Sequence, residues 1–307
     1  MRIGWLKCIS AVLLPHSLCR STTANAPANR QMPIASVVRR QFRKRKKDMK
    51  SIIKIVFLLA SVSLYGQTVN MTTDWQKDIL SNLFKSEYKD SLNKYDFGKL
   101  WTETENKDIY GIIGENYQRI RIKILSVTRQ KTNKNTYEVI GKSLVKNNVC
   151  DFHGTITINS IKVYKVKHWG VDNEYQNKGI KKQGLLIAKY HLEEDSTQTH
   201  SGIFDGILYT SWFVDKSGKL KYDKIEYNSD NYRNNQFIGT WTDYATRKKK
   251  VCNWADFRVP NCGDLDIGAG EFSPDDKYLK FGWQTYRDAY SKDNKLARQE
   301  EEKQWWK

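Results

Sequence analysis

Basic and apolar side chains alternate strictly in Arg119-Ile-Arg-Ile-Lys-Ile124. Successive side chains of a β-strand point to opposite faces of a sheet, so this stretch predicts a strand with one buried and one solvated face. Thr136–Val145 predicts the next strand, and the following Asn147-Asn148 suits a tight hairpin turn with positive φ angles. The alternation and the tight turn therefore predict an antiparallel sheet built from strands that are neighbours in the sequence.

Further short strands extend toward the C-terminus. The apolar phase slips by one residue at Asn159-Ser160, which predicts a β-bulge. Later strands are expected at 185–192, 202–214, 220–227, 237–244 and 249–254. About nine strands without intervening helices predict a mainly β fold, an antiparallel barrel or sandwich. A helix from Thr73 and a charged C-terminal helix over 284–307 are expected to flank it.

One local pattern occurs three times along the predicted strands. It reads Phe152-His-Gly154, Phe204-Asp-Gly206 and Phe237-Ile-Gly239. A glycine inside a strand marks a bend or a close backbone approach, and closing a small barrel requires such corners. The pattern therefore predicts barrel corners packed by aromatic rings, in preference to a ligand-contact motif.

Charge is distributed unevenly along the 307 residues, whose formal net charge is +18. Residues 1–48 hold 11 of the 52 Lys and Arg residues and a single acid, whereas residues 67–307 hold 39 basic and 33 acidic residues. The second region has an ordinary soluble surface without a phosphate-binding stripe. No nucleic-acid partner is therefore expected.

Residues 49–66 have the form of a cleavable signal peptide. A short cationic segment (49–54) precedes a predominantly apolar run of ten residues (55–64) and the small residue Gly66. The apolar run is too short to span a bilayer, and no cysteine stands directly after the expected cut, so we expect a periplasmic or secreted protein that is not a lipoprotein. Residues 1–48 are interpreted as an over-extended gene start, with a genuine long leader or a disordered basic extension as alternatives. The mature chain is then one mainly β domain, 67–283, followed by the C-terminal helix, with no transmembrane span.

Three cysteines follow the predicted signal peptide: Cys150, Cys252 and Cys262. Export to an oxidising compartment favours disulfides over metal binding or catalysis. We expect a Cys150–Cys252 bridge, which requires their strands to be neighbours, with Cys252–Cys262 as the alternative.

The segment 263–276 concentrates acids among glycines. Asp264, Asp266 and Glu271 could supply hard oxygen ligands to Ca²⁺, although the spacing fails the EF-hand template, and a structural loop is preferred. The same three carboxylates are the candidate catalytic residues of a hydrolase, which would require convergence in one cleft, with Asp256 as a further partner. No metal-binding histidine motif is present, and no cofactor is expected.

Several segments resemble an uncharacterised family of exported bacterial β proteins. They are Asn147–Gly154, Phe237–Trp241, Cys252–Pro260 and Gly263–Phe272. The resemblance covers roughly Met49 to Trp283 and implies an exported β fold, but it transfers no functional residue. Gly239-Thr-Trp241 is also similar to the Gly-x-Trp of lipocalin-like barrels, although that motif normally lies on the first strand.

The leading functional prediction is a non-enzymatic exported barrel. Its interior or rim would bind an apolar or glycan ligand, or it would act as an envelope-associated module, because strand 202–214 is apolar on both faces and the chain is rich in tryptophan. The candidate ligand-contacting residues are Trp212, Trp241 and Trp254. The alternative is a secreted hydrolase that uses carboxylates of region 256–276. The oligomeric state is left open.

Overall fold

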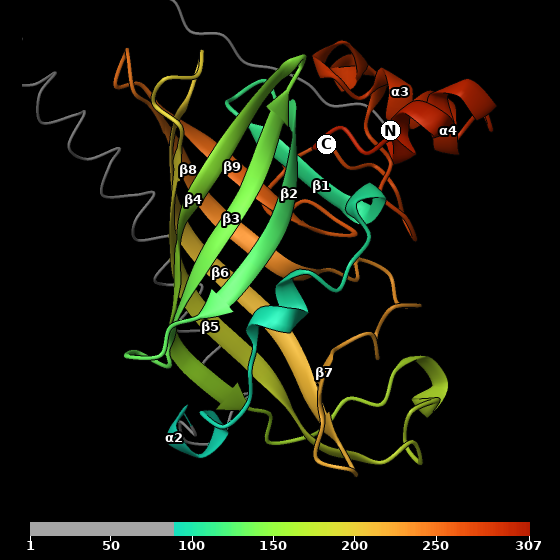
Figure 1. Ribbon diagram of the computed structural model, residues 1–307. Helices are drawn as coiled ribbons and strands as arrows, with labels where there is room; N and C mark the ends of the chain where they lie inside the picture. Colours follow the sequence, from blue (N-terminus) through green and yellow to red (C-terminus); the bar gives the residue numbers. More distant parts are fainter. Residues whose placement is uncertain (1–88) are drawn as a thin grey trace, which may run out of the picture. The chain divides into compact units, whose positions relative to one another are not determined.

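The computed structural model describes residues 89–307, which form a nine-stranded antiparallel sheet (Figure 1). The strands are β1 (Ile109–Ile113), β2 (Gln118–Arg129), β3 (Thr136–Val145), β4 (Asn148–Val163), β5 (Ile180–Glu194), β6 (Gly202–Asp215), β7 (Leu220–Tyr222), β8 (Asn234–Asp243) and β9 (Lys249–Asp256). The helical segments are α2 (Lys89–Leu92), η1 (Gly98–Trp101), η2 (Asn106–Asp108), η3 (Val171–Asn173), η4 (Asp276–Phe281), α3 (Gln284–Tyr290) and α4 (Lys295–Glu302).

Eight strands close into a barrel. The order β5-β4-β3-β2-β1-β9-β8-β6 is joined into a ring by the ladder between β5 and β6. The extra strand β7 pairs with the last residues of β6, Trp212–Val214, whereas β8 pairs with its first part, Gly202–Tyr209. The prediction of a mainly β antiparallel fold is confirmed, and of the two architectures considered the structure is a barrel.

Inward and outward positions follow the predicted alternation. On β2, Ile120, Ile122 and Ile124 are buried in the barrel core, while Arg119 and Arg121 occupy the alternate positions. The predicted bulge on β4 is present as a register shift between Ile158 and Ser160. The predicted turn after β3 also forms, but its positive φ angle is at Lys146 (56°) instead of at the asparagines.

Aromatic rings fill the middle of the barrel. Phe237 stacks on Trp254 with ring centroids 4.6 Å apart, and Tyr190 contacts both rings at 5.3 Å. Phe204 meets Trp254 edge-on at 5.8 Å. Because these side chains are almost fully buried, this part of the interior is a packed core without space for a ligand.

Two glycines of the repeated pattern make room for that packing. Gly206 and Gly239 face each other across the β6–β8 ladder. A Cβ atom at either position would lie 2.5 Å from the hydroxyl oxygen of Tyr190 and within 2.3 Å of a backbone oxygen. The pattern is therefore a packing device in which missing side chains accommodate an aromatic ring, as predicted for barrel corners.

The residues before β1 plug one end of the barrel. Trp101 Nε1 donates a hydrogen bond to Thr210 Oγ1 (3.0 Å), and the main-chain N–H of Phe97 donates to the Tyr137 hydroxyl (3.2 Å). Leu100 O accepts a hydrogen bond from Asn235 Nδ2 at 2.8 Å. η1 thus covers the end where β1 begins, and we call this the plugged end.

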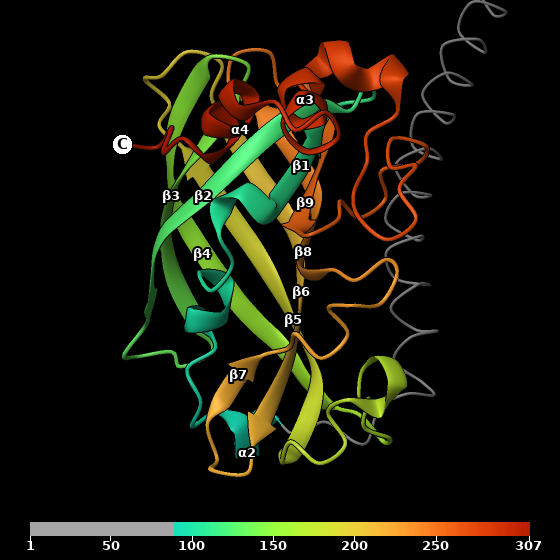
Figure 2. The same ribbon diagram turned by 90° about the vertical axis from the view of Figure 1, so that its right-hand side faces the viewer.

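The segment after β9 forms a second layer on the outside of the barrel. Figure 2 shows α3 and α4 beside β1 and β2, and a second apolar cluster joins β1 to α3 and to the segment between β9 and α3. The cluster consists of Tyr110, Ile112, Val259, Cys262, Leu265, Phe272, Trp283 and Tyr286. The C-terminal region is therefore helical, but it contains two short helices in place of the single one predicted over 284–307.

The cysteine prediction is corrected by the topology. Cys150, Cys252 and Cys262 are all buried free thiols. Cys150 lies on β4 and Cys252 on β9, and β3, β2 and β1 separate these strands, so the expected neighbourhood is wrong. Cys262 lies in the outer layer, away from the barrel interior that holds Cys252. Neither the Cys150–Cys252 bridge nor the Cys252–Cys262 alternative is formed.

Several sequence predictions fall outside the described residues. These are the leader at 1–48, the signal peptide at 49–66 and the helix expected from Thr73. Among residues 89–307, no helix has the length and apolar character needed to cross a bilayer.

Replacing Gly239 by alanine should destabilise the barrel. The new methyl group would collide with the backbone oxygen of Asp205, 2.1 Å away, and with Tyr190. We expect chemical denaturation to show a loss of about 1–3 kcal/mol in the free energy of unfolding, the usual cost of overpacking. Gly270→Ala is the matched control, because its Cβ would meet only an atom 3.9 Å away. Equal stability of the two variants would contradict this packing role.

Candidate functional site

A cavity of about 1040 Å³ opens at the end of the barrel opposite the plug. We call this end the mouth; it lies where β3 ends and β4 begins. The inward residues next to the aromatic core are small here: Ser143 lines the cavity, and Cys150, Gly202 and Cys252 are buried residues that do not line it. Because these residues cannot fill the barrel's cross-section, the interior is hollow at the mouth although it is packed below.

Glu194 is buried beside this cavity. It follows Tyr190 and Leu192 on the inward face of β5 and is 4% exposed. Its Oε2 atom accepts hydrogen bonds from Trp241 Nε1 and from the main-chain N–H of Gly202, both at 2.8 Å, and its Oε1 atom accepts from the Ser143 hydroxyl. Burial raises the pKa of Glu194, while these three hydrogen bonds oppose the shift.

Sequence reasoning missed Glu194. The signal that could have identified it is its phase, since an acid at an inward position of an alternating strand must be bonded inside the barrel. The pattern of β5 shows the inward phase only once the interior is known to face Tyr190 and Leu192. Residues 185–188 are buried on both faces, which hides the alternation.

Three lysines stand at the rim of the cavity: Lys146, Lys249 and Lys250. Lys250 alternates in phase with the inward residues Cys252 and Trp254, and its Nζ atom lies 5.2 Å from the centroid of the Trp241 ring. None of the three ammonium groups forms an ion pair or hydrogen bond with a side chain in the described part of the chain. Their charges are available to a ligand.

The outer layer contributes Phe281 to the cavity wall. The main-chain oxygen of Phe281, at the end of η4, accepts a hydrogen bond from Gln118 Nε2 at 2.8 Å. The next residue, Gly282, has φ +96° and accepts a hydrogen bond from Arg119 Nη1 at 3.4 Å. Two consecutive residues at the start of β2 thus fix this wall of the mouth.

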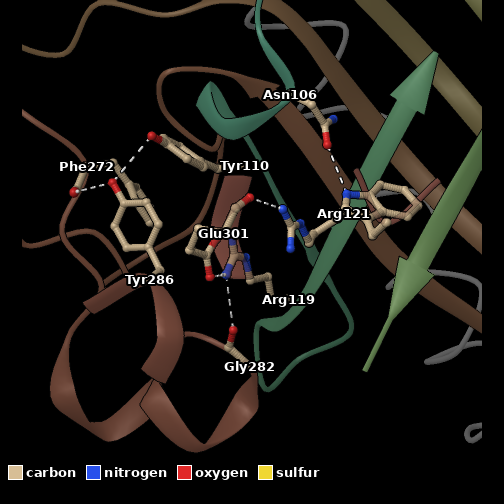
Figure 3. Close-up of polar contacts among 9 residues, drawn as sticks. Asn106, Tyr110, Arg119, Arg121, Phe272, Gly282, Tyr286 and Glu301 are labelled. Atoms are coloured by element: carbon tan, nitrogen blue, oxygen red, sulfur yellow. Dashed lines mark hydrogen bonds and ion pairs between the residues drawn. The ribbon is translucent and has the colours of Figure 1, made fainter. Parts of the chain in front are cut away.

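Arg119 is itself held by a buried ion pair with Glu301 of α4 (Figure 3). Nη1 and Nη2 donate to the two carboxylate oxygens at 2.8 and 2.6 Å, and both side chains are almost fully buried. Burial alone would raise the pKa of Glu301, but the hydrogen bonds and charge of Arg119 lower it below its usual value. The bidentate geometry therefore keeps the pair ionised inside the protein.

Further contacts hold the end of the chain against the same strand. Arg121 Nη2 donates a 2.5 Å hydrogen bond to the main-chain oxygen of Glu301. Trp305 Nε1 donates to Asn106 Oδ1 at 2.9 Å, and its ring lies 5.8 Å from the Arg121 guanidinium. We call Arg119, Arg121, Glu301 and Trp305 the clamp. It fastens the outer layer to β2, next to the segment that presents Phe281.

The three tryptophans predicted to contact a ligand lie in two different places. Trp241 lines the cavity, 5% exposed. Trp212 and Trp254 are 0% and 2% exposed in the packed core. A ligand at the mouth can therefore reach Trp241, whereas contact with the other two would require the core to open.

The acids predicted as catalytic or Ca²⁺-binding residues do not gather in one cleft. Asp264 is exposed and bonded to Lys277 Nζ at 2.5 Å, and Glu271 is exposed. Asp266 pairs with Arg258 at 2.7 Å and also accepts hydrogen bonds from main-chain N–H groups of its own loop. Among the described residues, no three His, Cys, Asp or Glu side chains are arranged to hold a metal ion. These acids stabilise a loop, in line with the preferred structural reading of this segment.

Asp256 lies inside the barrel at the plugged end. Its Oδ2 atom accepts hydrogen bonds from Thr104 Oγ1 (2.8 Å), the Tyr222 hydroxyl (2.6 Å) and Asn235 Nδ2 (2.8 Å). Burial raises the pKa of Asp256 to about 7 although these donors oppose the shift. It does not line the mouth cavity, and its three donors come from the plug and the strands around it, so we assign it to the network that holds the plug.

His191 is bonded to two carboxylates on the outer face of the barrel. His191 Nδ1 lies 2.6 Å from Asp205 Oδ1, and its Nε2 lies 3.0 Å from Glu193 Oε1. The hydrogen bond with Asp205 is the main reason that the pKa of His191 is raised. These side chains are half-exposed on the outer face of the barrel, away from the cavity.

Asp256 should give the protein a pH-dependent stability. The unfolded carboxyl loses its proton near 3.8, while the folded one keeps it until about 7. This contribution is complete below about pH 4 and is lost as the pH rises through about 7, a total of about 4 kcal/mol. Asp256→Asn keeps an acceptor oxygen but does not titrate. Urea unfolding at several pH values should show a flatter profile for this variant, and an unchanged slope would contradict the assignment.

Breaking the clamp should be costly. Glu301→Gln leaves the Arg119 charge buried without a counter-ion, so we expect a loss of about 3 kcal/mol in the free energy of unfolding. Glu300→Gln, on the same helix, removes only an exposed pair with Lys303 at 3.7 Å, and a change below about 0.5 kcal/mol is expected. If the two variants unfold at the same denaturant concentration, the buried pair is not a stabilising contact.

The sequence resemblance transfers no functional residue, and the mouth brings together Glu194, Trp241, Phe281 and the rim lysines from distant segments. Comparison with protein-family models, with curated proteins and with solved structures finds no match to this chain.

Proposed function

We propose that this protein is a non-enzymatic ligand-binding barrel that holds a small, largely apolar molecule in its mouth. The observation that carries the proposal is the cavity of about 1040 Å³. Pockets for small molecules usually have volumes of about 300–1,000 Å³ and occur in the mouths of β-barrels. The mouth has the size and the position of such a site.

The lining of the cavity supports an apolar ligand. Ile113, Ile120, Val145, Trp241 and Phe281 supply apolar wall surface. Binding sites of this kind combine apolar walls with a few polar groups that fix the orientation of the ligand. Glu194 and the rim lysines are such groups, since Glu194 is bonded to the indole of Trp241 and Lys250 lies over its ring.

The packed core limits how deep the ligand can lie. Phe204, Phe237 and Trp254 occupy the interior below the cavity, so the ligand would extend from the rim to the level of Trp241 and Glu194. Between the two ligand classes predicted from the sequence, this arrangement favours an apolar molecule over a glycan. A glycan would need accessible aromatic faces, and the rings of Trp212 and Trp254 are covered.

Export through the segment at 49–66 remains part of the proposal. Its support is the sequence pattern of a cationic stretch, an apolar run and a small residue. An exported barrel with a mouth cavity would bind its ligand outside the cytoplasm. The scattered acids of region 256–276 give no corresponding support to the hydrolase alternative.

Filling the mouth should abolish binding of an apolar probe. Val145→Trp places a large ring in the cavity from the inward face of β3, while Ile140→Trp adds the same ring on the outward face of that strand. The affinity for Nile red is measured from its fluorescence increase on binding. We expect Ile140→Trp to bind the probe like the wild type and Val145→Trp to bind it at least about tenfold more weakly. Equal binding by all three proteins would refute the mouth as the site.

A further inference from the structure

Three unpaired cations surround the entrance of an otherwise apolar cavity, and this arrangement indicates the chemistry of the ligand. Building on the proposed function, we infer that the ligand is an amphipathic anion, with an acidic head group at the rim and an apolar body in the mouth. Lys146, Lys249 and Lys250 are the residues assigned to the head group.

The lysines approach the entrance from two sides. Lys146 belongs to the turn between β3 and β4, whereas Lys249 and Lys250 begin β9, which is separated from β3 by β2 and β1. All three are exposed and line the same cavity. An anion at the entrance would therefore be approached by ammonium groups from more than one strand.

Three acids, Glu115, Glu194 and Asp243, also line this cavity and differ in how much of the lysine charge they offset. Asp243 accepts a hydrogen bond from the main-chain N–H of Thr246 at 2.7 Å, which lowers the pKa of its carboxyl, and the nearby charge of Lys250 lowers it further. Glu194 is buried and already accepts three hydrogen bonds. Glu115 is exposed in the turn between β1 and β2. With Glu194 buried, the three lysines of the rim face the carboxylates of Asp243 and Glu115, which leaves an excess of one positive charge.

Glu194 also determines which way the ligand points. An acidic head group inserted first would approach the buried Glu194 carboxylate. The neighbouring donors already donate to Glu194 and are not free to bind a second anion. With the head group at the rim, the apolar body instead meets Ile120, Val145 and the Trp241 ring. Opposite charge at the rim and like charge at the floor thus favour the same orientation.

A head-group series on one alkyl chain tests the inference with the full chain. The ligands are dodecanoate, dodecyl phosphate, dodecyl maltoside and dodecyltrimethylammonium, titrated calorimetrically below the concentrations at which they form micelles. We expect both anions to bind at least about tenfold more tightly than the cation, with affinities that decrease as salt is added. The ratio between the two anions distinguishes a carboxylate from a phosphate head group, and inorganic phosphate alone should not bind.

Two triple variants separate the rim from the overall charge. Replacement of Lys146, Lys249 and Lys250 by glutamine should reduce anion affinity about tenfold and leave the maltoside unchanged. Replacement of Lys131, Lys165 and Lys189, which are exposed elsewhere, changes the net charge equally and should have no effect. If all four alkyl ligands bind equally and the rim variant binds like the wild type, the anion inference is wrong while the proposed function stands. If none of them binds and Nile red also fails, both are wrong.

Discussion

The ladder between β5 and β6 closes the sheet, and the rest of the structure depends on that closure. A closed ring of eight strands satisfies the backbone hydrogen bonds that an open edge would expose, but it also fixes the cross-section of the interior. That cross-section must be filled by side chains or left hollow. Aromatic rings fill the middle. Gly206 and Gly239 have no side chain and so leave space for Tyr190 inside the closed barrel. Where small side chains replace the rings, the mouth remains open.

Much of this arrangement could be predicted from the sequence because it depends on local periodicity. Alternation in β2, the slipped phase of β4 and the Phe-x-Gly pattern follow from the two-residue repeat of a strand, and the structure confirms them. Closure of the ring could not be deduced in the same way, since it depends on which strands become neighbours. For that reason the predicted bridge between Cys150 and Cys252 is wrong.

The candidate site was even less accessible to sequence reasoning. Its members come from seven strands, three turns and η4, and no short motif links them. Trp241 was identified because tryptophan is conspicuous, whereas Glu194 and Lys250 look like ordinary surface charges until their inward phase is known. The acids of the glycine-rich segment have a structural role instead. Asp266 accepts hydrogen bonds from main-chain N–H groups of its own loop and pairs with Arg258. The distinctive segment 263–276 thus forms a structural loop, whereas the mouth cavity is lined by residues without a distinctive sequence pattern.

The clamp has a consequence for how the protein is made. Arg119 and Glu301 are separated by 182 positions in the sequence, so the guanidinium has no counter-ion and stays uncovered until translation has passed α4. Hairpins such as β3–β4 can form as soon as they leave the ribosome, but the outer layer cannot dock before that point. A nascent chain halted between β9 and α4 would therefore expose a basic strand flanked by apolar surface, which is the kind of segment that chaperones bind.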